Sequence, residues 1–245
     1  MKTEFSKKQS EYWDSYTKDI DYLELIDIPR AEKIEFAFLK RILGKIKDKT
    51  ILDLGCGTGK FGLKLAAQAK EVIGIDISKS SVGIANRTAK KNNIRNFKGV
   101  VGDFKDKGYK NYFDTVLAVN LIHHADDLDE ILKHVAISLK KNGKLIVFEM
   151  NSMNLLFIPF LIYIGQAKSH LTWQYLRSNL FSLKYVLAKN GYRIESVKRW
   201  SWLPTSLYNK SLVFKSINET LNKIPLINLF TAFNIFVCSF DPQRD

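Results

Sequence analysis

The chain has 245 residues, of which 46% are hydrophobic, and this length suits one soluble α/β domain with additions. Its formal net charge of +13 favours acidic partners such as nucleic acid, anionic lipid headgroups or acidic substrates. The two cysteines, Cys56 and Cys238, are far apart and form no CxxC motif, so no disulfide framework and no metal site is expected.

Predicted helices and strands alternate from residue 50 onward. Before them, residues 31–47 repeat apolar residues at spacings of four, which predicts an amphipathic helix. Apolar stretches then predict strands at 50–55, 71–78, 96–104, 113–120 and 144–150, with helices at 60–69, 79–92 and 127–141 between them. We expect Ser78 to cap the second of these helices, and Asn142-Gly143 to end the third. Apolar strands separated by helices predict a parallel sheet that is covered on both faces.

The pattern changes after Asn151. Residues 151–177 are apolar and aromatic with a basic tail, and residues 201–232 form a second long connection. Between and after these segments, the sequence predicts a helix at 178–190 and strands at 192–200 and 233–240. Seven strands are therefore expected in all.

A glycine-rich loop follows the first strand: ILDLGCGTGKFG, residues 51–62. Gly57 to Gly62 fit GxGxxG, and Asp76 lies nineteen residues beyond Gly57, as in dinucleotide-binding sites. Asp53 argues against NAD, because its carboxylate is expected to face the ligand and would repel a pyrophosphate. The loop also lacks the GxxxxGK[ST] pattern of a phosphate cradle. A carboxylate at this position favours a cationic ligand, and S-adenosylmethionine carries an ammonium and a sulfonium.

Five segments in order resemble motifs of the class I S-adenosylmethionine-dependent methyltransferases: ILDLGCGTG, VIGIDIS, VVGDF, FDTVLAVNLIHH and LKKNGKLIVFE. The resemblance runs from about residue 12 to 150, and more loosely to 240. It implies a Rossmann-like seven-stranded, mostly parallel sheet with an antiparallel last strand, helices on both faces and helical lid insertions. The single domain, 1–245, would comprise an N-terminal helical cap (1–48), a cofactor-binding core (49–150) and acceptor-side insertions (151–177 and 201–232).

The resemblance also implies cofactor contacts for the glycine loop. Gly55, Gly57 and Gly59 would let the backbone approach the methionine part and the ribose, where a Cβ would collide. Asp53 would act near the ammonium, directly or through water. Within the loop, Thr58 is a further candidate contact, and Cys56 is expected to be a small loop residue rather than a nucleophile. Gly62 is expected to serve helix packing.

Further cofactor contacts are implied by the segments after the next three strands. Asp76 would accept hydrogen bonds from both ribose hydroxyls, and Ile77 would flank the adenine. Asp103 would accept from the adenine amino group, with Phe104 nearby, although Asp103 could instead be a turn residue. Asn120 would face the cofactor near the reacting methyl group.

The acceptor is harder to infer. Residues 120–123 lack the [DN]PP[YF] motif used on amino groups, and no Pro-Cys follows. His123 and His124 could take a proton from a hydroxyl acceptor, or could cap or pack under the next helix. Tyr12, Trp13 and Tyr16 could close over the cofactor or pack in a helix interface.

The segment 151–177 contains Phe157 and Phe160 within a run of apolar residues followed by cations. It could be a helical hairpin packed on the domain, or a lid for a lipophilic or lipid-linked acceptor that touches an anionic membrane surface. Its apolar run, 155–165, contains Pro159 and is too short to cross a bilayer, and residues 1–16 lack the apolar stretch of a signal peptide. A cytoplasmic protein, at most peripheral to the inner face of the membrane, is expected.

We therefore predict methyl transfer from S-adenosylmethionine to a small or lipophilic acceptor, as O- or C-methylation of a lipid, a quinone-like molecule or a lipid-linked glycan. An RNA methyltransferase is the first alternative, supported by the net charge but opposed by the lack of a recognisable RNA-binding module. An NAD-dependent oxidoreductase and a non-catalytic binding domain are the others.

Overall fold

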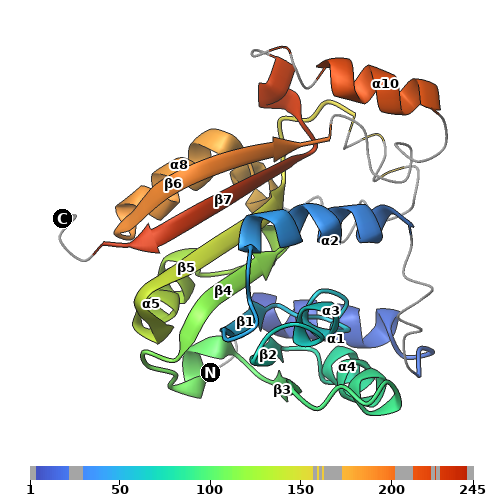
Figure 1. Ribbon diagram of the computed structural model, residues 1–245, viewed down its shortest axis with the longest axis vertical. Coiled ribbons are helices and arrows are strands. Elements are labelled where there is room, and N and C mark those ends of the chain that lie inside the picture. The colour runs from blue at the N-terminus through green and yellow to red at the C-terminus, as the bar shows by residue number, and fades with distance from the viewer. Residues whose placement is uncertain are drawn as a thin grey trace.

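The computed structural model describes residues 4–21, 30–156, 159, 162, 173–201, 212–221, 224 and 227–241 (Figure 1). Its centre is a seven-stranded sheet in the order β3-β2-β1-β4-β5-β7-β6. The strands are β1 (Thr50–Leu54), β2 (Glu71–Asp76), β3 (Phe97–Val101), β4 (Phe113–Val119), β5 (Leu139–Met150), β6 (Tyr192–Trp200) and β7 (Phe233–Phe240). All seven strands lie where the hydrophobic pattern predicts them.

Strand directions also follow the prediction. Neighbouring strands from β3 to β5 pair in parallel, whereas β7 is antiparallel to both β5 and β6. The chain order reverses between β1 and β4, where the sheet continues in opposite directions from the first strand. In open α/β sheets, ligands bind beyond the carboxyl ends of the strands at such a reversal.

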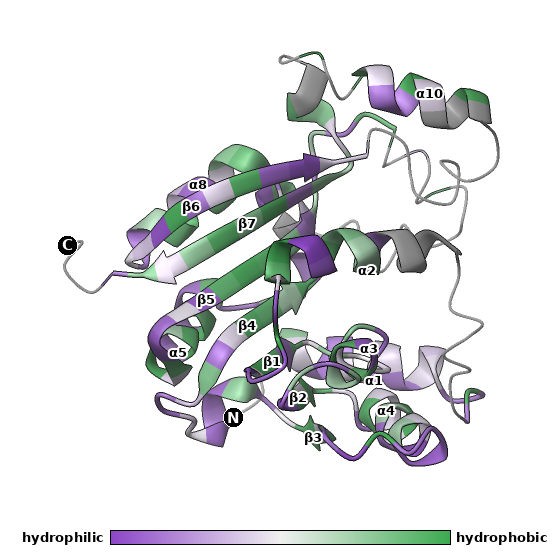
Figure 2. Cartoon of the chain, viewed as in Figure 1, coloured by the Kyte–Doolittle hydropathy of each residue, from purple (hydrophilic) through white to green (hydrophobic). Residues whose placement is uncertain are grey.

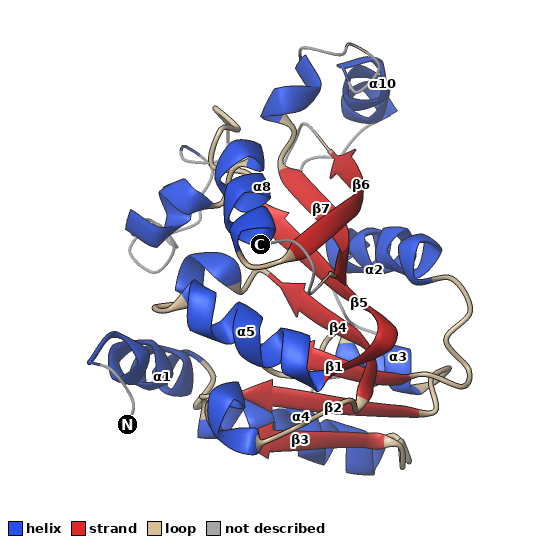
Figure 3. Ribbon diagram, turned by 90° about the vertical axis from the view of Figure 1, so that its left-hand side faces the viewer, coloured by secondary structure: helices blue, strands red, loops and turns tan. Residues whose placement is uncertain are grey.

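Helices cover the sheet on both faces (Figure 3). They are α1 (Glu4–Tyr16), α2 (Arg30–Leu43), α3 (Gly62–Ala66), α4 (Lys79–Lys91), α5 (Leu128–Ser138), α8 (Leu180–Lys189) and α10 (Leu212–Leu221), with short 3-10 turns η1 (Phe104–Lys107), η2 (Ile122–His124), η3 (Trp173–Arg177) and η4 (Ile227–Phe230). One hydrophobic layer packs α2, α3 and α4 against the sheet, and a second packs α5 and α8 against the other face. Hydrophobic residues accordingly dominate the central strands β4, β5 and β7 (Figure 2).

Local signals explain most helix boundaries. Ser78 caps α4 as predicted, because its hydroxyl accepts a hydrogen bond from the Ser81 N–H. The prediction for 127–141 is wrong at its end: α5 stops at Ser138, and β5 begins at Leu139. Asn142 has a φ of 68°, and the pairing register between β4 and β5 shifts after Phe113. The Asn142-Gly143 signal therefore marks an irregularity in a strand rather than the end of a helix.

Several predictions of the sequence lie outside the described residues. These include Phe157 and Phe160, together with part of each of the segments 151–177 and 201–232. Within the described part of the chain, no helix is long and apolar enough to cross a membrane, and no group of three or more metal-binding side chains gathers. Both cysteines are buried and free.

Candidate functional site

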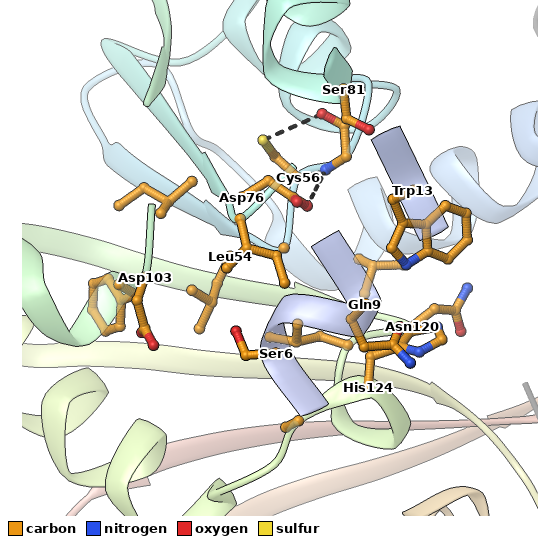
Figure 4. A pocket seen from close by; sticks show the side chains of 18 of the residues that line it. Ser6, Gln9, Trp13, Leu54, Cys56, Asp76, Ser81, Asp103, Asn120 and His124 are labelled. Atoms are coloured by element: carbon orange, nitrogen blue, oxygen red, sulfur yellow. Dashed lines mark hydrogen bonds between the residues drawn. The ribbon is translucent and has the colours of Figure 1, made fainter. Parts of the chain in front are cut away.

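A cavity of about 520 Å³ opens beyond the carboxyl ends of β1, β2 and β4. Its walls come from the loops after β1, β2, β3 and β4 and from one side of α1. Figure 3 shows α1 beyond the ends of the parallel strands, and Figure 4 shows side chains from all these segments converging on one space. The volume is in the range of small-molecule and cofactor sites.

The glycine loop after β1 forms the first wall. The N–H groups of Gly55 and Cys56 donate to the carbonyl of Ile75, at 2.8 and 3.1 Å, and tie the loop to β2. Gly57 has a φ of +50°, and a Cβ built there would meet no atom within 4 Å, because it would point into open space. Gly57 therefore presents bare backbone to the cavity, as a close-fitting ligand requires.

Asp76 joins the loop to the end of β2. Its Oδ2 accepts from the Gly57 N–H at 2.8 Å, and its Oδ1 accepts from the Ser78 N–H at 2.9 Å. Burial raises the pKa of this carboxyl above its ordinary value, although both N–H donors act in the opposite direction. Each carboxylate oxygen keeps a second lone pair, so Asp76 can still accept hydrogen bonds from a ligand in the cavity.

The structure corrects the expected place of Asp53. Its side chain does not line the cavity but lies buried behind the loop, where Oδ2 accepts from the Gly62 N–H at 2.9 Å. Burial raises the pKa of Asp53 to about 7. Asp53 therefore supports the glycine loop from behind, and its charge is no argument about which ligand the cavity takes.

The remaining loop residues divide between lining and packing. Cys56 and Thr58 line the cavity. The Cys56 thiol donates to the Gly57 carbonyl at 3.6 Å, and burial raises its pKa, which agrees with a packing role rather than a nucleophile. A Cβ at Gly59 would lie 2.9 Å from Ala85, and one at Gly62 would lie 2.7 Å from Asp53 Oδ2. Gly62 serves packing as predicted, and the space beside Gly59 is filled in the same way.

The residues expected to surround an adenine lie together after β2 and β3. Ile77, Asp103 and Phe104 all line the cavity. Asp103 also begins the turn η1, because its Oδ1 accepts from the Lys105 N–H at 3.0 Å. The two alternatives that the sequence left open for Asp103 are therefore compatible, since its side chain is a cap that faces the cavity.

The turn after β4 separates the two predicted histidines. His124 lines the cavity, whereas His123 has no exposed surface and lies under the turn, 2.6 Å from Glu149 through its Nδ1. Burial lowers the pKa of His123 to about 3, so its ring stays neutral in the folded protein. The prediction that His123 could take a proton from an acceptor is wrong, because no acceptor in the cavity can reach it.

Asn120 precedes this turn and also lines the cavity. It has a φ of +50°, which is unusual outside glycine and which turns the chain away from β4. Its side-chain Oδ1 is buried and has no hydrogen-bond partner within the described residues. A buried amide oxygen of this kind is available to a donor group on a ligand.

Helix α1 closes the opposite side of the cavity. Trp13 and Tyr16 line it as predicted, and the Trp13 ring meets the His124 ring edge-on at a centroid distance of 5.6 Å. Tyr12 does not line the cavity but stacks on Tyr16 at 6.2 Å. Asp14 binds the helix to the start of α4, because its Oδ1 accepts from the Ser78 hydroxyl at 2.6 Å and from the Ser80 N–H at 2.9 Å.

The sequence reasoning missed other lining residues of α1 and the acidic character of the cavity. Ser6 and Gln9 line the cavity from the helical face that also carries Trp13 (Figure 4). Gln9 lies four residues before Trp13 and Ser6 three residues before Gln9, and this helical spacing is a signal that could have identified them. The lining also includes five carboxylates but only two lysines: Glu35, Asp76, Asp103, Asp126 and Asp127 against Lys60 and Lys105. In a chain with a net charge of +13, this cavity is locally acidic.

Comparison with known proteins identifies the relatives of this site. Residues 45–212 match the family described as "Methyltransferase domain". A protein of Pelagibacter ubique named ubiquinone biosynthesis O-methyltransferase is 30% identical over 152 residues, which are 60% of this chain and 62% of that protein. A protein of Clostridium tetani named as an uncharacterized RNA methyltransferase is 29% identical over 78% of this chain and 36% of its own length. The chain thus spans less than two thirds of each of these relatives.

Solved structures share the fold at lower identity. Magnesium protoporphyrin IX methyltransferase of Synechocystis, a structure with bound S-adenosylhomocysteine, superimposes with a TM-score of 0.65 at 18% identity. The superposition covers 97% of this chain and 100% of that one. This similarity supports the fold of the whole described chain.

Proposed function

The chain belongs to the methyltransferase-domain family of S-adenosylmethionine-dependent enzymes, and we propose that it transfers a methyl group from S-adenosylmethionine to a small-molecule acceptor. The observation that carries this proposal is the wall formed by the Gly57 backbone and Asp76 in an acidic cavity. Five lining carboxylates suit a ligand with an ammonium and a sulfonium and disfavour the phosphates of a dinucleotide.

The residues of the cavity fit this cofactor. Asp76 keeps acceptor capacity for the ribose hydroxyls, and Gly57 leaves room where a side chain would stand. The buried Oδ1 of Asn120, which has no partner in the part of the chain that the structure describes, can accept from a donor of the ligand. When bound, S-adenosylmethionine supplies an electrophilic methyl group on its sulfonium.

The chain's own contribution to the reaction is to orient and desolvate. Trp13 and Tyr16 of α1 cover the cavity and exclude water, while Asn120 and His124 line the side after β4. Methyl transfer is an in-line displacement that needs an aligned, desolvated acceptor. Where the acceptor is a hydroxyl, His124 is the histidine of the pair that can take its proton, because His123 is buried.

Calorimetry with S-adenosylmethionine, S-adenosylhomocysteine and NAD tests the proposal. We expect binding of the first two and none of NAD. The variant Asp76→Ala should weaken S-adenosylhomocysteine binding by about 2–3 kcal/mol, because hydrogen bonds to a buried carboxylate are lost. Asp106→Ala, at an exposed residue of η1 outside the cavity, is the matched control. Tight binding of NAD without either adenosyl ligand would refute the proposal.

We further propose that the acceptor is lipophilic and that the protein meets an anionic membrane surface to reach it. Support comes from residues at the end of the segment 151–177 and in the helix that follows it. Leu176, Phe181 and Tyr185 are exposed hydrophobic side chains on η3 and α8, and exposed Arg177 and Lys184 lie among them. Apolar side chains flanked by cations suit the boundary between headgroups and acyl chains. The Pelagibacter ubique relative is named for ubiquinone, a lipophilic class of molecule.

Co-sedimentation with vesicles of phosphatidylcholine and phosphatidylglycerol tests this second proposal. We expect binding that weakens at high salt, since exposed charges are screened. The double variant Phe181→Ser/Tyr185→Ser should reduce it several-fold, whereas Ile137→Ser, at an exposed residue of α5, should not. The proposal would be refuted if the protein bound no vesicles at any salt concentration, or if it bound RNA but not vesicles. The exposed side chains would then be part of an ordinary surface.

A further inference from the structure

A buried carboxylate lies behind the turn that follows β4, which forms the wall of the cavity away from the glycine loop. Glu149 is the penultimate residue of β5 and has no exposed surface. Its neighbours in the strand are the buried hydrophobic residues Phe148 and Met150. A carboxyl group in such surroundings costs free energy unless hydrogen bonds compensate for the lost water, so its contacts are informative.

Both oxygens of Glu149 bind the same short turn. Oε2 accepts from the Ile122 N–H at 2.6 Å, and Oε1 lies 2.6 Å from Nδ1 of His123. Just before the turn, the N–H of Asn120 donates to the Phe148 carbonyl at 2.8 Å. The turn η2 is therefore attached to β5 at two residues, and the chain that leads into it is attached at a third.

The same turn carries side chains into the cavity on its other side. Asn120, Leu121 and His124 all line the cavity. The His123 ring contacts the His124 ring, with 4.0 Å between centroids and the planes tilted by 45°, and His124 in turn meets Trp13 of α1. A displacement of the His123 ring would therefore move the floor on which His124 rests.

We infer that Glu149 is a positioning residue that fixes the turn Asn120–His124, and with it the side of the cavity where the acceptor must approach. Glu149 touches neither ligand, because it does not line the cavity. It acts through the Ile122 N–H and the His123 ring. The inference rests on the proposed function only where it assigns this side of the cavity to the acceptor. The attachment of the turn is independent of any ligand.

A role in stability alone does not account for these contacts. A carboxylate kept for stability alone would need no bond to a histidine whose ring supports a cavity residue. Asp114 shows this simpler type: it lies at the start of β4, accepts from the Thr50 N–H at 2.8 Å and from Lys140 Nζ at 2.7 Å, and is remote from the cavity. Asp114 therefore offers a matched control.

The experiment compares Glu149→Gln, Glu149→Ala and Asp114→Ala by nuclear magnetic resonance of the imidazole and indole rings. The chain has four histidines and four tryptophans, so the ring signals can be assigned. In the wild type we expect a hydrogen on Nδ1 of His123 and a through-space contact between the Trp13 and His124 rings. Glutamine can keep the bond from the Ile122 N–H while its amide donates to His123. Glu149→Gln should therefore move the hydrogen to Nε2 and preserve the Trp13–His124 contact.

Glu149→Ala removes both bonds and should abolish the Trp13–His124 contact, which Asp114→Ala should leave intact. If Glu149→Ala keeps the contact and the wild-type His124 signals, the inference is wrong. If that variant fails to fold, an unchanged His123 tautomer in Glu149→Gln overturns the inference instead. Calorimetry with S-adenosylhomocysteine on the wild type and Glu149→Gln separates the two proposals. We expect less than a threefold difference in affinity between the two proteins. If neither protein binds, the proposed function is refuted, and the resonance data on the rings still test the role of Glu149.

Discussion

The two walls of the cavity are built by different means. The wall after β1 and β2 is a backbone wall, which consists of glycine N–H groups, one carboxylate and a stretch of bare chain bonded to one another and to β2. The wall formed by α1 and the turn after β4 is a side-chain wall, in which Trp13 meets His124. The residues next to them, Asp14 and His123, bond to Ser78 and Glu149, which are distant in the sequence. A backbone wall needs a contiguous run of particular residues, whereas a side-chain wall can be assembled from scattered ones.

The largest predicted effect concerns Asp53, which supports the backbone wall from behind. Burial raises its pKa in the folded protein from 3.8 to about 7, so folding takes up a proton between these values. Stability from this group is present below pH 4 and is lost as the pH rises through 7, by up to about 4 kcal/mol for roughly three pKa units. Asp53→Asn should remove this decline, as urea unfolding between pH 5 and 8 can measure.

The comparison with another carboxyl sharpens the Asp53 test. Hydrogen bonding to Lys140 and Thr50 lowers the pKa of Asp114 despite some burial, so its contribution is lost as the pH falls. His123, whose pKa is lowered to about 3, acts in the same direction below pH 6.5. Of these three groups, only Asp53 predicts a decline toward high pH, and Asp76, whose pKa burial also raises, acts in the same direction. Asp53→Asn should therefore flatten its share of this decline, and parallel curves for this variant and the wild type would contradict the assignment.

The next prediction tests whether the backbone wall depends on the absence of a side chain at Gly57. Gly57→Ala and Gly44→Ala each place a Cβ on a residue of positive φ, at +50° and +63°, with no protein atom within 4 Å. Both should lower the free energy of unfolding by about 1–2 kcal/mol through the left-handed backbone. Gly57→Ala alone should also weaken S-adenosylhomocysteine binding at least tenfold by calorimetry, because its Cβ enters the cavity. Equal affinity of the two variants would show that the ligand does not approach Gly57.

The smallest effect should come from the side-chain wall. Asp14→Ala removes the bonds from the Ser78 hydroxyl and the Ser80 N–H that hold α1 to α4. Loss of such bonds should weaken the attachment of α1 to α4 by about 1 kcal/mol. Because α1 covers the cavity, S-adenosylhomocysteine should then dissociate about fivefold faster in stopped-flow measurements. Glu11→Ala, at an exposed position of the same helix, is the control. An unchanged dissociation rate for Asp14→Ala would mean that α1 does not limit ligand exit.

The contrast between the walls explains what the sequence could predict. The strands, the Ser78 cap and the place of Gly57 and Asp76 in the cavity wall could be predicted, because they depend on local pattern or on one contiguous motif. The place of Asp53 is not readable, since a residue at the end of a strand can face either side of the loop that follows. Glu149 gives no signal at all, because its partners Ile122 and His123 are 27 and 26 residues away and meet it only through the pairing of β4 with β5.

The attachment of α1 has one further consequence, which concerns measured affinities. Trp13 and Tyr16 line the cavity while Asp14 binds Ser78 and Ser80. For a ligand that binds only when the helix is docked, docking of the helix and occupancy of the cavity would be linked equilibria. The apparent dissociation constant of such a ligand then equals its intrinsic value divided by the fraction of molecules in which α1 is docked. Reciprocally, a bound ligand must protect the amides of α1 from hydrogen exchange by the free energy that couples docking to binding. This protection extends to amides that touch no ligand atom.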